Sequence, residues 1–175
     1  MNIKRLVLGG GCFWCIEAVF RKVKGVQSVV SAYTGGKRAY PTYENICTGT
    51  TNHAEVIDIK YDAELISLEN LLDIFFAIHD PTTLNAQGAD KGTQYRSVIY
   101  YNNEEEKSFI EDFIGKIQRN FNDNIVTEVT QLGDLYPAED YHQNYYNLNL
   151  SQGYCQVIIE PKLRKFISKF PQFLN

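Results

Sequence analysis

The stretch LGGGCFWCIEAVF, residues 8–20, decides how the chain begins to fold, because three glycines join a predicted strand to a predicted helix. The preceding residues IKRLVL (3–8) are typical of a short buried strand. Beyond Gly11, apolar residues recur at helical spacing, at Phe13, Ile16, Phe20 and Val23. Glu17 and Arg21 are then expected to form an i, i+4 ion pair on the outer face of this helix.

The rest of the chain alternates strand-like and helix-like segments. Strands are predicted within 25–36, 53–62, 95–102 and 124–132, and an extended piece at 154–161. Helices are predicted at 67–79, at 104–121 behind an Asn103 cap, at 137–148 and at the C-terminus. The segments 37–52 and 80–94 are rich in turn residues and are predicted to be long loops.

These elements predict an α+β fold in one catalytic domain, residues 1–175. We expect a two-layer sandwich, in which helices flank a mixed β-sheet as in a ferredoxin-like plait. A chain of 175 residues is long enough for one hydrophobic core. Since long loops in small domains are usually functional, we expect the active site where the two loops meet the GGGCFWC turn.

Composition and charge exclude several classes of protein. The net charge of -4 and the pI near 5.4 argue against a nucleic-acid partner. The N-terminus lacks the apolar core of a signal peptide, and the sequence has no apolar run of membrane-spanning length, so we expect a cytoplasmic protein with no membrane partner. In a reducing compartment, the four cysteines are expected to be redox centres, metal ligands or buried residues.

Cys12 is a candidate nucleophile because it lies at the first turn of a helix, where unpaired N–H groups and the helix dipole should lower the pKa of a thiol. Cys15 completes a C-x-x-C pair, close enough for disulfide geometry. Two alternatives fit the same pair: a general thiol-disulfide oxidoreductase, or a zinc module completed by Cys47 and Cys155. A dinucleotide-binding glycine motif fails at Trp14, where a third glycine is required.

Beyond this turn, the sequence resembles the peptide methionine sulfoxide reductases of type A, in a variant with a GCFWC motif. The resemblance rests on the motifs GCFW, YTGG, PTYENICTGTTNHAE, HDPTTLNAQGADKGTQYRS and YPAEDYHQNYY. It covers most of the chain, from about residue 7 to residue 155. It implies thiol-dependent reduction of methionine-S-sulfoxide, free or in proteins, in the repair of oxidised proteins, with no metal and no organic cofactor.

The resemblance also implies a role for each matched residue. Cys12 would attack the sulfoxide sulfur, and Glu55 would donate a proton to its oxygen. Tyr43 and Tyr95 would form hydrogen bonds with that oxygen. Phe13 and Trp14 would hold the methyl group of the substrate. Asp90 would help to bind substrate and reductant. A proton donor is needed because a sulfoxide sulfur is a poor electrophile, and burial beside tyrosines and Trp14 would keep Glu55 protonated.

In this family, a resolving thiol converts the sulfenic acid of the nucleophile into a disulfide, which thioredoxin reduces. Cys15 stands where the family more often has glycine, and Cys155 lies in a GYC segment that we expect to be flexible. We predict Cys15 as the main resolving thiol because it is adjacent, with Cys155 as the alternative or as part of a relay. Cys47 is predicted to be structural. The expected partners are thioredoxin and methionine sulfoxide, and we expect a monomer.

Overall fold

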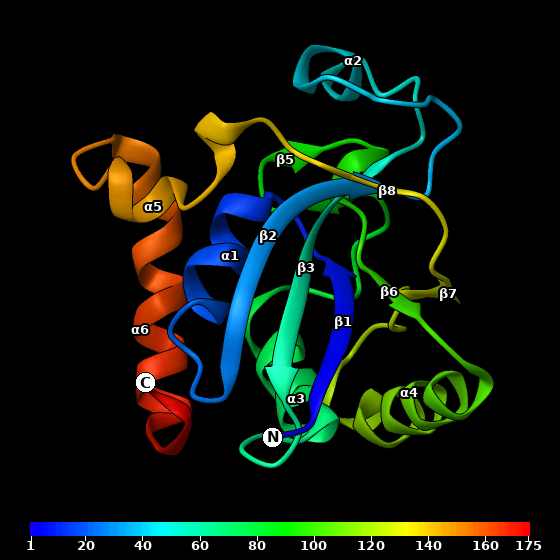
Figure 1. Cartoon of the computed structure of the whole chain (residues 1–175), viewed down its shortest axis with the longest axis vertical. Helices are drawn as coiled ribbons and strands as arrows, with labels where there is room; N and C mark the ends of the chain where they lie inside the picture. The colour runs from blue at the N-terminus through cyan, green and yellow to red at the C-terminus, as the bar shows by residue number, and fades with distance from the viewer.

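A six-stranded mixed sheet forms the centre of the protein. The computed structural model describes all 175 residues (Figure 1). Along the sheet the strand order is β7-β6-β1-β3-β2-β8, and every neighbouring pair is antiparallel except β6 with β7. The strands are β1 (Ile3–Gly9), β2 (Val26–Thr34), β3 (Ala54–Asp62), β6 (Val98–Tyr101), β7 (Glu128–Gln131) and β8 (Leu135–Pro137). A separate hairpin pairs β4 (Ala86–Gln87) with β5 (Asp90–Lys91).

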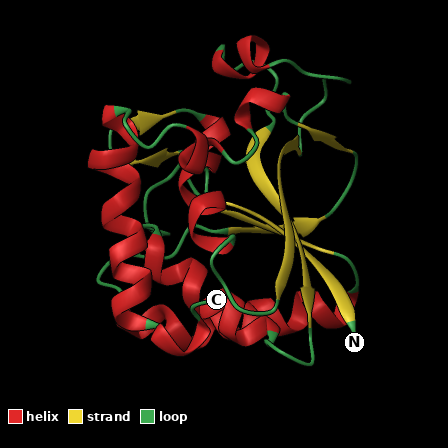
Figure 2. Ribbon diagram, turned by 60° about the vertical axis from the view of Figure 1, so that its left-hand side comes forward, coloured by secondary structure: helices red, strands yellow, loops and turns green.

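Helices gather mainly on one side of this sheet, as Figure 2 shows. The helices are α1 (Phe13–Phe20), α2 (Tyr43–Cys47), α3 (Leu68–Ile78), α4 (Glu104–Ile117), α5 (Tyr145–Leu148) and α6 (Glu160–Lys169). Successive side chains along a strand point to opposite faces of the sheet, so the apolar residues form two sets. Leu6 and Leu8 belong to the large core under α1, α3 and α6, whereas Val7 belongs to a smaller cluster on the other face. The expected α+β architecture, a mixed sheet flanked by helices, is therefore confirmed. No helix combines the length and the apolar character needed to span a lipid bilayer.

The structure confirms the strongly periodic elements. The helix predicted at 67–79 is α3, and Ser67 caps it by accepting a hydrogen bond from the Asn70 N–H. The helix predicted at 104–121 is α4 followed by one 3-10 turn, and Asn103 accepts a hydrogen bond from the Glu106 N–H. These elements depend on local spacing and capping, which the sequence carries directly.

Three predictions on local structure were wrong. The piece 154–161 is helical, because Cys155–Ile159 form a π-helical turn that continues into α6. The helix predicted to begin at Pro137 does not, because Pro137 ends β8 and α5 begins only at Tyr145. The loop 37–52 contains α2, whose first turn is capped reciprocally by Thr42 and Asn45.

The error at 154–161 has a physical cause. Val157, Ile158 and Ile159 are β-branched and therefore favour a strand. However, Cys155, Ile159 and Leu163 recur every four residues, and all three are buried in the core. Packing of this helical face outweighs the local preference for a strand.

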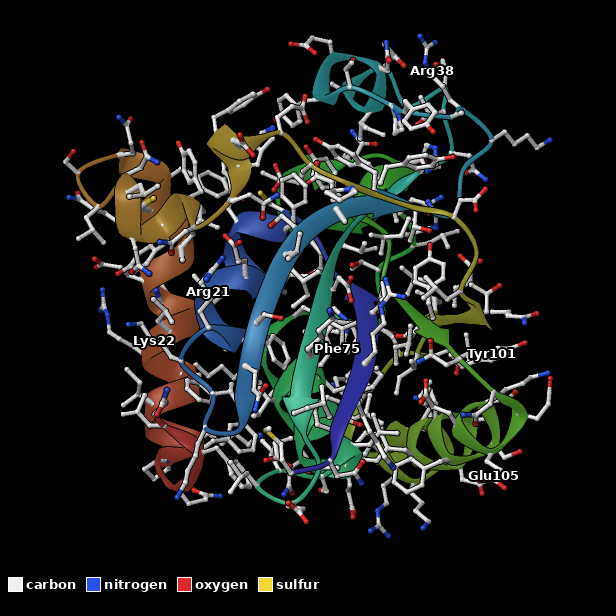
Figure 3. All side chains as sticks on the ribbon, viewed as in Figure 1. Arg21, Lys22, Arg38, Phe75, Tyr101 and Glu105 are labelled. Carbon is white, nitrogen blue, oxygen red and sulfur yellow. The ribbon has the colours of Figure 1, made fainter.

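Glu17 is buried rather than on the outer face of α1. Its ion pair with Arg21 is present at 3.3 Å, but the Glu17 side chain is only 1% exposed. In Figure 3 the labelled Arg21 side chain extends from α1, and its guanidinium also donates to the carbonyl oxygen of Val29 in β2 at 3.0 Å. The two Glu17 oxygens accept further hydrogen bonds from the N–H groups of Asn144 (3.0 Å) and Tyr145 (3.3 Å). These N–H groups lie at the start of α5, so Glu17 attaches the segment around α5 to α1.

We predict that Glu17→Ala lowers the free energy of unfolding by about 2 to 4 kcal/mol, because it leaves buried N–H groups and Arg21 without their acceptor. Denaturant titration measures this loss. The matched control is Glu160→Ala, which removes an exposed i, i+4 pair with Arg164 (3.5 Å) and a long hydrogen bond from the Tyr146 hydroxyl (3.4 Å), and should cost about 1 kcal/mol or less. Equal losses for the two variants would contradict a buried anchoring role for Glu17.

Candidate active site

The turn between β1 and α1 places Cys12 at the N-terminus of α1, as its N-cap residue. Glycine is required at two points of this turn. A Cβ atom at Gly9 would lie 2.6 Å from the carbonyl oxygen of Glu55, and Gly11 has a φ of +86°, in the left-handed region. The Gly11 N–H donates to the carbonyl oxygen of Tyr95, the residue after the loop 80–94, at 3.1 Å. A Cβ atom at Gly11 would lie 2.9 Å from Cγ of Gln87, so this loop does meet the turn, as expected.

The two cysteines of the C-x-x-C pair lie in different surroundings. Cys12 is partly buried, and Cys15 is 3% exposed. Burial raises the pKa of the Cys12 thiol well above its ordinary value, and Cys15 and Glu55 raise it further. A hydrogen bond from Cys12 lowers the pKa of Cys15, against the effect of burial. The predicted lowering at Cys12 was therefore wrong, because desolvation and neighbouring acidic groups outweigh the helix N-terminus, and the lowered pKa belongs to Cys15.

Glu55 lies near the start of β3 and is 1% exposed. One carboxylate oxygen accepts a hydrogen bond from the Phe13 N–H at 3.2 Å, directly beside Cys12. Burial raises the pKa of Glu55 to about 8; the Phe13 hydrogen bond opposes this rise, and the charge of Asp90 adds to it. The predicted protonated carboxylic acid is therefore available at neutral pH.

Trp14 is held from two sides by the segment 140–145. Its indole N–H donates to Nδ1 of His142 at 3.0 Å. The Tyr145 ring stacks on the indole, with centroids 3.7 Å apart and planes 8° from parallel. Phe13 is fully buried and lies between Tyr33 (5.6 Å between centroids) and His142 (5.1 Å). Phe13 thus supports the aromatic wall from the core side, while Trp14 is only half-buried.

Tyr43 and Tyr95 belong to different loops, and both lie close enough to Glu55 to be affected by its charge. Tyr43 begins α2, and its ring centroid lies 4.5 Å from that of His142. Tyr95 ends a 3-10 turn, and its carbonyl oxygen accepts the hydrogen bond from the Gly11 N–H. Burial raises the pKa of both hydroxyl groups above the ordinary value, and the charge of Glu55 adds to this rise in each. Both hydroxyls therefore stay protonated as hydrogen-bond donors near Glu55.

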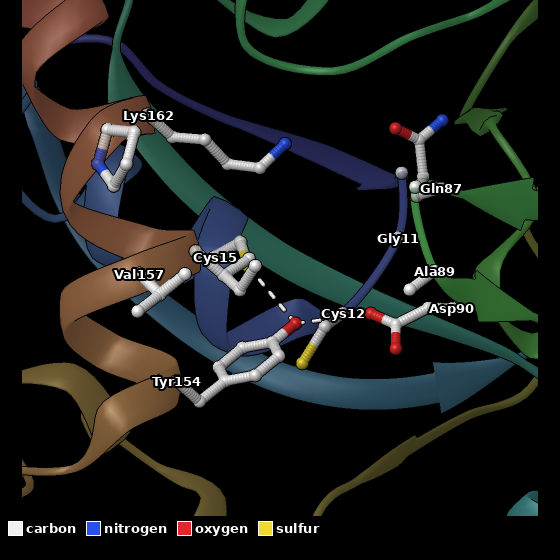
Figure 4. A pocket seen from close by; sticks show the side chains of 13 residues that line it. Gly11, Cys12, Cys15, Gln87, Ala89, Asp90, Tyr154, Val157 and Lys162 are labelled. Carbon is white, nitrogen blue, oxygen red and sulfur yellow. Dashed lines mark hydrogen bonds between the residues drawn. The ribbon is translucent and has the colours of Figure 1, made fainter.

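A cavity of about 350 Å³ opens on the Cys15 side of the nucleophile (Figure 4). Cys12, Cys15, Asp90, Tyr154 and Lys162 are among its lining residues, whereas Glu55, Tyr43, Tyr95, Phe13 and Trp14 are not. In Figure 4, the Tyr154 hydroxyl lies between the Cys15 sulfur and the Asp90 carboxylate. Of the predicted site residues, Cys12, Cys15 and Asp90 thus line this cavity, and the others do not.

Two other cysteines differ from expectation. Cys155 does not lie on a flexible segment, because it is fully buried in the π-helical turn. Cys47 is exposed on α2, so it does not contribute to the core as a structural residue would. The cause in each case is packing: Cys155 belongs to the core-facing row that runs from the π-helical turn into α6, while α2 buries only Ile46.

Two residues near the site were missed from the sequence. His142 contacts Trp14, Phe13 and Tyr43, and Tyr154 contacts Cys15 and Asp90. The only available signals were the position of His142 within YPAEDYHQNYY and of Tyr154 next to Cys155. No spacing rule connects them to a turn more than 120 residues earlier, since 128 residues separate His142 from Trp14 and 139 separate Tyr154 from Cys15.

Solved structures with the same fold include Mxr1 from Saccharomyces cerevisiae. Its reduced form superposes with a TM-score of 0.81 at 33% identity, covering 88% of this chain and 90% of that one. Mxr1 from the same yeast in complex with Trx2 superposes with a TM-score of 0.59 at 23% identity, covering 82% and 85% of the two chains. This second similarity supports the fold alone.

The sequence comparisons cover nearly the whole chain. The family described as "Peptide methionine sulfoxide reductase" matches residues 4–173. The peptide methionine sulfoxide reductase MsrA of Nitratiruptor sp. is 56% identical over 169 residues, 97% of each chain. The resemblance inferred from the motifs is therefore confirmed, and this chain belongs to the peptide methionine sulfoxide reductase family.

Proposed function

We propose that this protein reduces methionine-S-sulfoxide, free or within proteins, to methionine and so repairs oxidised proteins. Family membership supports this reaction. The observation that carries it is a buried, protonated Glu55 beside the Cys12 thiol, because an acid next to a nucleophile is what a sulfoxide requires. Neither a general thiol-disulfide oxidoreductase nor a zinc module is favoured by the relatives.

In the first step, the Cys12 sulfur attacks the sulfoxide sulfur while Glu55 donates a proton to its oxygen, and the proton of the Cys12 thiol passes to the Glu55 carboxylate. The oxygen passes to Cys12, which becomes a sulfenic acid, and methionine leaves. The proposed roles of Tyr43 and Tyr95 are to donate hydrogen bonds to that oxygen, and both hydroxyls lie within the electrostatic influence of Glu55. Trp14 would contact the methyl group of the substrate, and Phe13 would support this wall from the core.

In the second step, Cys15 would resolve the sulfenic acid by forming a disulfide with Cys12. Its place one turn along α1 and its lowered pKa support this role. Cys155 is the alternative, but it is buried in a helical turn that would have to open. Thioredoxin would then reduce the disulfide, as the structure of the yeast relative Mxr1 with Trx2 suggests. Asp90, at the rim of the cavity, would help to bind substrate and reductant.

We also infer that residues 1–175 form one catalytic domain with a ferredoxin-like plait at its centre. The strand order β6-β1-β3-β2, with α1 and α3 as the intervening helices, supports this plait. We also propose that the protein is a monomer and that it acts in the cytoplasm. A reducing compartment suits two neighbouring thiols that must be reduced after each turnover.

Cys12→Ser should abolish methionine formation, because serine cannot form the sulfenic acid. The measurement uses the separated S and R epimers of a blocked methionine sulfoxide with dithiothreitol, and only the S epimer should be consumed by the wild type. Cys47→Ser is the matched control and should keep full activity, since Cys47 is exposed on α2 and serine keeps a polar group beside Tyr43. Reaction of neither epimer with the wild type would refute the proposed function.

Glu55→Gln should slow methionine formation by about 100-fold or more at neutral pH, since glutamine cannot donate the proton. The carboxyl group of Glu55 in the wild type has a pKa of about 8. The rate advantage of the wild type over the variant is therefore present below this pH and is lost above it. The ratio of wild-type to variant rates should therefore fall as the pH rises through 8. Because Glu55 also raises the pKa of Cys12, the pH dependence of Cys12 alkylation is measured in both proteins, and each rate is divided by its thiolate fraction before the ratio is taken. A ratio independent of pH would contradict the role of Glu55 as an acid.

A further inference from the structure

Tyr154 connects the proposed resolving thiol to a carboxylate. Its hydroxyl oxygen lies 3.6 Å from the Cys15 sulfur and 3.1 Å from Oδ2 of Asp90. The three groups come from α1, from the π-helical region before α6, and from β5, and they meet at the wall of the cavity (Figure 4). Tyr154 is held in place by its edge-on contact with Trp14, with centroids 5.7 Å apart.

The hydrogen bonds that join Cys15, Tyr154 and Asp90 have a definite direction. A tyrosine hydroxyl has one hydrogen, and its geometry toward Asp90 is that of a donor to a carboxylate. The hydroxyl oxygen can therefore accept a hydrogen bond from the Cys15 thiol. A continuous path leads from the Cys15 S–H through Tyr154 to Asp90.

We propose that Tyr154 is a catalytic residue of the resolving step, which passes the proton of Cys15 to Asp90. This inference rests on the proposed function for its substrate and on Cys15 as the resolving thiol. The Cys15 thiol gives its proton to the Tyr154 oxygen while Tyr154 gives its own to Asp90. The Cys15 thiolate attacks the Cys12 sulfur, the S–S bond forms, and the S–O bond of the sulfenic acid breaks. The hydroxide takes the proton from Asp90 and leaves as water, so no external oxidant or reductant is needed.

The need for such a path arises from the first step itself. In the reduced protein, Cys12 lowers the pKa of Cys15, and Tyr154 lowers it as well. The S–H group of Cys12 is consumed when Cys12 takes up the sulfenic oxygen, whereas the Tyr154 hydroxyl is not. The ionisable groups around Cys15 are then Glu55, Asp90, Tyr154, Lys162 and Cys155, and of these Tyr154 forms a hydrogen bond with its sulfur. Lys162 instead donates to the carbonyl oxygen of Ile78 at 2.8 Å.

The same contact opposes Cys155 as the first resolving thiol. Cys155 follows Tyr154 directly, and its buried side chain is part of the same helical region. Moving Cys155 to Cys12 would unwind this turn and carry Tyr154 away from Cys15 and Asp90. Resolution by Cys15 with Tyr154 in place and resolution by Cys155 therefore require different conformations, and one molecule cannot adopt both at the same time.

The test compares wild type with Tyr154→Phe, which keeps the ring and removes the hydroxyl. One equivalent of methionine-S-sulfoxide, or separately one equivalent of hydrogen peroxide, is mixed with reduced protein in the absence of reductant. Rapid quenching follows methionine release, the sulfenic acid trapped on Cys12 and the mapped disulfide. We expect unchanged methionine release in the variant but Cys12–Cys15 disulfide formation slowed about tenfold or more at neutral pH. The deficit should shrink as alkaline pH ionises Cys15 directly.

Tyr146→Phe is the matched control and should resolve at the wild-type rate. Its hydroxyl donates to Oε1 of Glu160 at 3.4 Å and forms no hydrogen bond with a cysteine. Unchanged fluorescence of Trp14, the only tryptophan, verifies that the ring at position 154 still contacts the indole after the substitution. With peroxide loading, Asp90→Asn should slow resolution as Tyr154→Phe does, and the double variant should be no slower than either.

Two results would overturn the inference: wild-type rates of disulfide formation in Tyr154→Phe at every pH, or a wild-type product containing only Cys12–Cys155. Failure of the proposed function is a separate outcome. It would appear as absent methionine release, while peroxide loading still tests the path from Cys15 to Asp90.

Discussion

The hydrogen bond from the Phe13 N–H to the buried Glu55 carboxyl group is the contact on which the site depends. The first N–H groups of a helix have no partner within the helix, so α1 needs an acceptor at this point. Glu55 meets that need, but burial still outweighs this one bond and raises the pKa of Glu55 to about 8. A single contact thus completes the start of the helix and places a protonated acid beside Cys12. It is possible only because Gly9 lets β1 and β3 approach closely.

Helix α1 supports both the chemistry and the substrate wall. Its first turn carries Cys12, Trp14 and Cys15, and its second turn carries the buried Glu17. Glu17 holds the start of α5 through two N–H groups, and the same segment supplies the Tyr145 ring that stacks on Trp14. The orientation of the indole is therefore coupled to an anchor one turn further along the same helix.

The residues of the two halves of the proposed reaction differ in their relation to the cavity beside Cys12. Cys15, Tyr154 and Asp90, which would regenerate the thiol, line this cavity, whereas Glu55, Tyr43 and Tyr95, which would act on the sulfoxide, do not. Asp90 links the two groups of residues, since its charge raises the pKa of Glu55 while its carboxylate accepts a hydrogen bond from the Tyr154 hydroxyl. A change at Asp90 therefore affects both steps.

Elements and motifs that depend on local spacing could be predicted from the sequence. Apolar periodicity and caps predicted α1, α3 and α4, and the GCFWC turn identified Cys12 and Cys15, because neighbours along a helix interact through fixed geometry. Four other features could be seen only in the folded protein: which thiol has the lowered pKa, the burial of Glu17, the helical position of Cys155 and the contact between Tyr154 and Cys15. Each of these outcomes depends on desolvation or on contacts between segments far apart in the chain. Such contacts exist only after the sheet and its helices have packed together.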